Sequence, residues 1–233
     1  MRNPWAWRLA ALSGLLYPVL LIVGDDLIAR GDEVASDAGT PDEVAAVLAE
    51  KAGAAFFVGR SLGMISLLCL LVFVALVATR LRQLRGTTSV LPYLALGAGG
   101  VVVALQLSSA VFQIELVRHG GAGLDPGLVV LLLDFGRGFL VAMLPMALLL
   151  ATVAVEGYAG RLVGRAVGWC AGALSIALVV GFVVLVAGVP LGFLPMPLTW
   201  VWFVAAGVSV MRRVPGEPDA LAEDQRRLTR TTS

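Results

Sequence analysis

The stretch Leu131–Leu140 reads LLLDFGRGFL and places Asp134 and Arg137 inside the apolar run Gly127–Val155. By length and composition this run is typical of a transmembrane helix. Two opposite charges three residues apart lie on one face of a helix. Charges at membrane depth are costly, and they face the interior of a bundle or a water-filled cavity. The stretch therefore predicts a multi-helix membrane protein whose other helices bury this pair or use it.

The composition of the chain indicates the same class of protein. Its 233 residues are 59% hydrophobic and 14% charged, and the mean hydropathy is +0.92. So little charge excludes an ordinary water-soluble domain, and the net charge of +1 gives no sign of nucleic-acid binding. Lys51 is the only lysine among many arginines, which favours a bacterial source and hence location in a bacterial inner membrane.

Six apolar runs are long enough to span a bilayer, so we expect an all-α polytopic bundle with one domain over residues 1–214. Arginines follow the second, fourth and sixth runs, whereas the other loops are acidic or nearly neutral. Because basic loops stay in the cytoplasm, both termini are predicted to be cytoplasmic. The six runs cover residues 7–23, 54–79, 91–116, 127–155, 162–189 and 193–211.

The sequence also predicts the structure of two segments outside these runs. The outer loop 24–53 is acidic, and its Thr40–Glu43 combines an N-cap threonine, a proline and a capping-box glutamate. We therefore expect a short amphipathic helix over residues 41–53 on the outer surface. The tail 215–233 is polar and mixed in charge, which predicts disorder in the cytoplasm.

Glycines recur every four residues where the fifth run begins, and this spacing lets two helix backbones approach closely. Two uses stay open: packing within the bundle, or a seam with a second copy or a membrane partner. Gly181 lies outside this series, so a larger residue is expected to be better tolerated there. The series consists of Gly160, Gly164, Gly168 and Gly172.

A short internal similarity links the openings of the second and fifth runs. Val58–Gly63 reads VGRSLG and Val163–Gly168 reads VGRAVG. The two runs cross the membrane in opposite directions, which is the spacing of a three-plus-three inverted repeat such as some transporters have.

Polar residues of the first four runs gather in the predicted outer half of the membrane. At about 1.5 Å per residue, Gln106 and Arg137 come near the bilayer centre, with Arg60 and Asp134 nearer the outside. One hypothesis is structural: Arg60 pairs with Asp134, and Arg137 pairs with Gln106 or Glu115. The other is a pocket open to the outside, where the arginines hold an anionic group and a carboxyl takes a proton. The candidate ligand-binding residues are Arg60, Gln106, Gln113, Glu115, Asp134 and Arg137.

Other chemistry finds little support in the sequence. His119 is the only histidine, and a metal or haem site needs more ligands, so we expect no metal and no cofactor. No histidine accompanies the intramembrane serines, and we assign no catalytic residue. The leading hypothesis is a non-enzymatic membrane protein that binds a small or lipid-like ligand or supports a membrane complex. A small transporter is the alternative, and an intramembrane enzyme with a buried carboxylic acid is third.

Three stretches in the first third of the chain resemble one group of families. They are Gly14–Pro18 (GLLYP) in the first run, Phe56–Arg60 (FFVGR) at the start of the second and Arg80–Arg82 (RLR) at its end. Together with the acidic outer loop they resemble the bacterial multi-pass membrane proteins of the DUF4386 type. The resemblance implies a compact helical bundle in a bacterial inner membrane, and it lends no functional residue.

Overall fold

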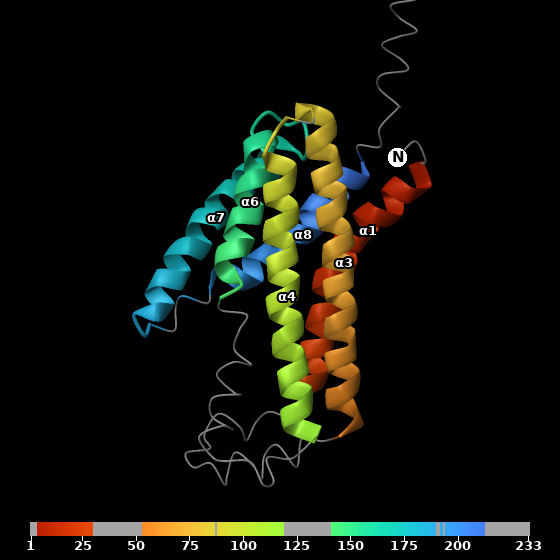
Figure 1. Cartoon of the computed structure of the whole chain (residues 1–233), viewed down its shortest axis with the longest axis vertical. Coiled ribbons are helices and arrows are strands. Elements are labelled where there is room, and N and C mark those ends of the chain that lie inside the picture. The colour runs from red at the N-terminus through yellow and green to blue at the C-terminus, as the bar shows by residue number, and fades with distance from the viewer. Residues whose placement is uncertain are drawn as a thin grey trace, which may run out of the picture.

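The computed structural model describes residues 4–29, 53–86, 88–118, 141–189, 192 and 194–212. The regular structure in these residues is helical, as the sequence predicts, and each helix falls on one of the six apolar runs (Figure 1). The helices are α1 (Pro4–Ala29), α3 (Ala54–Arg85), α4 (Leu91–Arg118), α6 (Met143–Gly157), α7 (Arg165–Val186) and α8 (Pro195–Met211).

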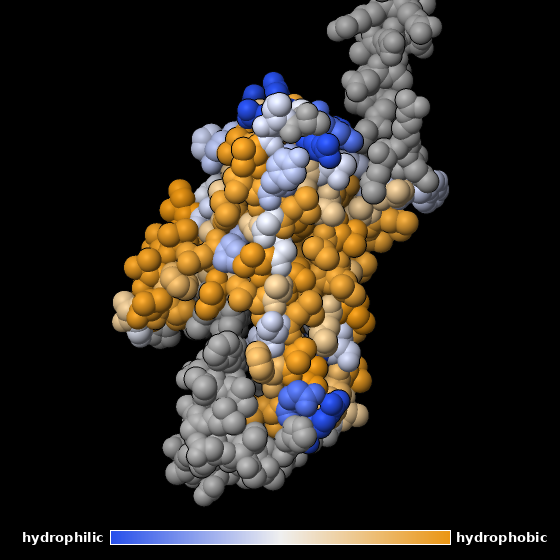
Figure 2. All heavy atoms as spheres, in the orientation of Figure 1, coloured by the Kyte–Doolittle hydropathy of each residue, from blue (hydrophilic) through white to orange (hydrophobic). Residues whose placement is uncertain are grey.

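Four of the helices, α1, α3, α4 and α7, are long and apolar enough to cross a membrane. Helices α6 and α8 are also apolar but shorter, with 15 and 17 residues. Apolar side chains cover most of the face seen in Figure 2, and hydrophilic ones gather at the two ends of the bundle. The chain is therefore an all-helical membrane protein.

Helices α1 and α3 continue beyond the apolar runs that predicted them. The first run was expected to end before Asp25, but α1 extends to Ala29, so residues 24–29 are helix and not loop. Polar residues end a hydrophobic run without ending a helix, because the helix satisfies its own backbone hydrogen bonds. The 32 residues of α3 span about 48 Å against a hydrocarbon core of about 30 Å.

Helix α7 begins later than predicted, at Arg165 instead of Leu162. Gly160 has a φ of +69°, in the left-handed region that glycine adopts most readily. Gly164 is extended, and its N–H donates to the Ser209 hydroxyl of α8 at 2.8 Å. The first two glycines of the series therefore form the turn before α7 and are not part of its helical face.

Several predictions fall outside the described residues. These are Asp134 and Arg137 with the start of their apolar run, the amphipathic helix over 41–53, and the tail 215–233.

The six described helices form a closed ring. Each packs on the next along the chain, α1 on α3, α3 on α4, α4 on α6, α6 on α7 and α7 on α8, and α8 packs back on α1. The Trp7 indole N–H on α1 donates to the Val210 carbonyl on α8 at 3.3 Å, which joins the two ends of the chain's helical part. Phe203 fills the interior of the ring, with its centroid 5.0 Å from that of Tyr17 and 5.9 Å from that of Phe73.

Close backbone approaches at glycines hold two helix pairs together. A Cβ on Gly59 of α3 would lie 2.5 Å from the Gly24 carbonyl oxygen of α1. A Cβ on Gly168 of α7 would lie 2.5 Å from the Gly157 Cα of α6, and one on Gly172 would collide with the Tyr158 hydroxyl. The helical part of the glycine series therefore packs on α6 within the chain, which favours the intramolecular hypothesis over a seam with a second copy.

The expectation for Gly181 is wrong. A Cβ there would lie 2.6 Å from the Gly192 carbonyl oxygen, so this position is also closely packed. The sequence spacing did not reveal it, because the contact comes from the turn before α8 and not from a second glycine series.

Candidate functional site

The charged side chains of the described residues separate to the two ends of the bundle. One end, where α3 and α6 finish and α7 begins (top of Figure 1), is strongly basic, and we call it the basic end. The opposite end carries Asp25, Asp26, Arg60, Glu115 and Arg118. The basic end carries Arg8, Arg80, Arg82, Arg85, Arg161, Arg165 and Arg212.

A cavity of about 330 Å³ lies toward the opposite end, between α1, α3, α4 and α8. We call it the Asp25–Arg60 cavity after the two charged residues in its wall. Its polar wall is completed by the α4 residues Gln106, Ser109 and Gln113. Its apolar wall includes Leu21, Leu67, Ala110, Met196 and Trp200.

The glycine contact between α1 and α3 explains how the two charges come together. Asp25 follows Gly24 and Arg60 follows Gly59, and these two glycines bring the helix backbones into contact. As a result the carboxylate and the guanidinium interact electrostatically across the helix pair. Any larger residue at Gly59 would separate the helices and so the charges.

The Arg60 guanidinium is only partly satisfied by its surroundings. Its Cζ lies 5.7 Å from the centre of the Phe56 ring, one turn earlier on α3, in a cation–π contact. Its Nε is buried and has no hydrogen-bond partner among the described residues. A buried donor without an acceptor is costly, so the described residues do not fully satisfy the hydrogen-bonding groups of this guanidinium.

On the other side of the cavity, α4 presents polar groups at helical spacing. The Gln106 side chain shares a hydrogen bond with the Tyr17 hydroxyl of α1, which is itself buried. Ser109 is buried one turn further along, and Gln113 continues the same face. The two α4 glutamines named as candidates from the sequence therefore line the cavity, with Ser109 between them.

The structure brings together three of the six candidate residues named from the sequence. Arg60, Gln106 and Gln113 line the cavity. Glu115 is not among the described lining residues. Its carboxylate accepts a hydrogen bond from Arg118 at 3.0 Å, at the exposed end of α4. Asp134 and Arg137 lie outside the described residues, so their predicted pairing with Arg60, Gln106 or Glu115 stays a prediction.

Sequence reasoning missed the partner of Arg60. Asp25 was assigned to the acidic outer loop, because the first apolar run was predicted to end at residue 23. A glycine immediately before each charge, on two consecutive helices, was the available signal.

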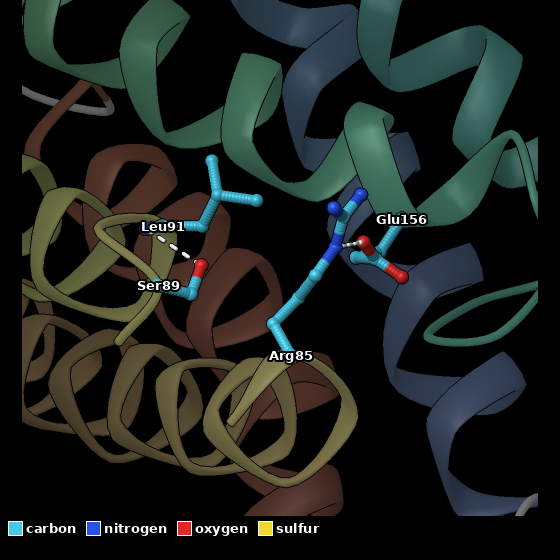
Figure 3. A network of polar contacts seen from close by, with 4 residues as sticks. All are labelled: Arg85, Ser89, Leu91 and Glu156. Carbon is cyan, nitrogen blue, oxygen red and sulfur yellow. Dashed lines mark hydrogen bonds and ion pairs between the residues drawn. The ribbon is translucent and has the colours of Figure 1, made fainter. Parts of the chain in front are cut away.

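A second polar contact, also missed, lies at the basic end. The Arg85 Nε on α3 donates to the Glu156 carboxylate on α6, and the two side chains point toward each other in Figure 3. The Glu156 side chain is 1% exposed, whereas that of Arg85 is 47% exposed. Because the carboxylate is buried and the arginine reaches solvent, this pair ties the end of α3 to the end of α6.

No protein-family model, curated protein or solved structure matches this chain. The resemblance of its first third to the DUF4386-type families stays a prediction.

Proposed function

We propose that this chain is a non-enzymatic membrane protein whose Asp25–Arg60 cavity binds a small or lipid-like ligand. In this proposal all six helices span a bacterial inner membrane and both termini are cytoplasmic. The observation that carries the binding function is a partly satisfied guanidinium in the wall of a mainly apolar cavity. Ligand sites are commonly of this kind, with apolar walls and a few polar groups that fix orientation. The cavity volume lies at the lower end of the range of such sites, which suits a small molecule or a lipid head group.

The distribution of charge supports the proposed orientation. Seven arginines of the described residues lie at the basic end, and Glu156 is the carboxylate there. Cytoplasmic ends of membrane proteins carry such an excess of arginine and lysine. This orientation places the Asp25–Arg60 cavity in the outer half of the membrane.

The orientation is testable by cysteine labelling after Cys69 and Cys170 have been replaced by alanine. A cysteine at Asp37 should react with a membrane-impermeant maleimide in intact cells. A cysteine at Gln83, on the last turns of α3, should react only after the cells are opened. Equal labelling of the two positions in intact cells would contradict the proposed topology.

The ring does not support the transporter alternative. An inverted repeat is related by a two-fold axis in the membrane plane. Seen along the membrane normal, such an axis turns a clockwise order of helices in one half into an anticlockwise order in the other half. Here the order of α6, α7 and α8 around the ring runs in the same direction as that of α1, α3 and α4.

The enzyme alternative needs a buried carboxylic acid, and Asp134 and Glu115 are the carboxylates among the candidate residues. Glu115 does not supply it, because its carboxylate binds Arg118 at the exposed end of α4.

A variant that fills the cavity tests the binding function. Gly63 shares one face of α3 with Arg60 and Leu67, and a Cβ there would meet no atom within 4 Å. Gly63→Leu should therefore place its side chain in the cavity without disturbing the backbone. In native mass spectrometry, protein purified in dodecyl maltoside should carry a small-molecule or lipid adduct that Gly63→Leu lacks.

The matched control is Gly97→Leu on α4, which also enters open space but is not among the described lining residues. This variant should keep the adduct. An identical adduct pattern for Gly63→Leu and wild type would show that the cavity is not the binding site.

A further inference from the structure

We infer that the ligand of the Asp25–Arg60 cavity is a zwitterionic amphiphile, with its anionic group on Arg60 and its cationic group near Asp25. This inference rests on the proposed function and specifies the chemistry of the ligand. It follows from the charge balance of the wall, from the guanidinium in it, and from the apolar remainder of the cavity.

The charges of the wall balance each other. Among the described lining residues, Asp25 is the one carboxylate and Arg60 the one guanidinium, and the rest are uncharged. A ligand with net charge would leave one charge uncompensated in a largely apolar site, and such a charge is costly. A ligand with one charge of each sign leaves none, and it can align its dipole with that of the wall.

Arg60 is suited to hold the anionic end. A guanidinium binds carboxylate and phosphate through pairs of N–H groups. The Nε–H of Arg60 is buried without a hydrogen-bond partner among the described residues, and Phe56 lies against the guanidinium. An anionic group on the cavity side therefore supplies acceptors and opposite charge to a guanidinium that the described helices satisfy only in part.

Two residues of the same cavity suit the cationic end. The Asp25 carboxylate supplies the opposite charge, and the Trp200 ring of α8 supplies an aromatic face. Ammonium groups, including quaternary ones, are bound by such faces through cation–π attraction.

The remaining wall is apolar, through Leu21, Leu67, Ala110 and Met196. The ligand therefore carries an apolar part beside its two charges. A membrane lipid with a zwitterionic head group has this chemistry, and so does a free zwitterion with an apolar substituent.

The test is thermal unfolding in dodecyl maltoside with added lipids of defined head-group charge. Phosphatidylethanolamine is the zwitterionic probe, phosphatidylglycerol the anionic one and a dialkyl trimethylammonium lipid the cationic one. At about 100 times its Kd, the zwitterionic lipid should raise the Tm of the wild type by roughly 5–10 °C. The charged lipids should raise it less.

Variants that change the charge of the cavity should change the order of preference. Asp25→Asn leaves a net positive wall and should prefer phosphatidylglycerol. Arg60→Gln leaves a net negative wall and should prefer the cationic lipid, and the double variant should not discriminate. Arg118→Gln, at the exposed end of α4, should keep the wild-type order.

The outcomes separate this inference from the proposed function. A wild type stabilised most by a charged lipid, with the effect abolished by Gly63→Leu, keeps the cavity as a ligand site and overturns the zwitterion. An unchanged preference in Asp25→Asn also overturns it. No stabilisation by any of the lipids or by glycerophosphoethanolamine overturns both proposals. A Tm increase with glycerophosphoethanolamine alone overturns the apolar part of the ligand, whereas an increase only with the intact lipid supports an amphiphile such as a membrane lipid.

Discussion

Arg85→Gln is expected to destabilise the protein by about 3–5 kcal/mol, because it strands the Glu156 carboxylate in the core. That carboxylate is 1% exposed and accepts its hydrogen bond from Arg85. The loss should be visible as a lower midpoint in SDS unfolding of protein in mixed micelles, followed by tryptophan fluorescence.

The two halves of the pair should behave differently. Glu156→Gln should cost less than Arg85→Gln, because the Arg85 side chain is 47% exposed and can turn toward solvent. The double variant should recover much of the loss, since both charges are then gone. Arg82→Gln, an exposed arginine one turn earlier on α3, is the matched control and should be close to neutral. Equal losses for Arg85→Gln and Arg82→Gln would show that the ion pair does not stabilise the bundle.

Gly168→Leu is expected to cost as much as the most severe overpacked cores, about 3 kcal/mol or more. Its first side-chain carbon alone would lie 2.5 Å from the Gly157 Cα. The obstacle is helix backbone and not the end of a flexible side chain, so α6 and α7 must move apart. That movement also lengthens the hydrogen bond from the Ser175 hydroxyl to the Ala147 carbonyl, now 2.8 Å.

The same unfolding measurement provides the comparison. Gly168→Ala should show an intermediate loss, and Gly97→Leu, which meets open space on α4, should show little. If Gly168→Leu were as stable as Gly97→Leu, the close approach of α6 and α7 would not be needed for folding.

The sequence predicted the described helices because hydrophobic runs report burial in lipid or protein directly. It did not predict their ends, because charge and helix formation are separate properties. Asp25 and Asp26 closed the apolar run and left α1 intact. Conversely, the apolar Leu162 and Val163 lie outside α7, in a segment whose glycines turn the chain.

The candidate site was predictable only one helix at a time. Polar side chains within otherwise apolar runs singled out Gln106 and Gln113 on one helix and Arg60 on another. Which carboxylate faces Arg60 depends on the contact between two particular glycines, and no single-helix pattern contains that information.

Buried tryptophans show the same limit. Tryptophan is enriched at membrane interfaces, so composition alone would place Trp7 and Trp202 there. Both are buried, and their indole N–H groups donate to the Val210 and Val167 carbonyls. An indole needs one acceptor, and a neighbouring helix supplies it as well as the membrane interface does.

The contact between α1 and α8 determines when, during synthesis of the chain, the bundle can complete its packing. A chain is made from its N-terminus, so α1 enters the bilayer long before α8 is translated. Until then α1 can pack on α3, while its surface that later contacts α8, including Trp7 and its indole N–H, lacks that partner. The last of the six helices therefore supplies the acceptor for the first, and the bundle reaches its final packing only when translation of α8 is complete.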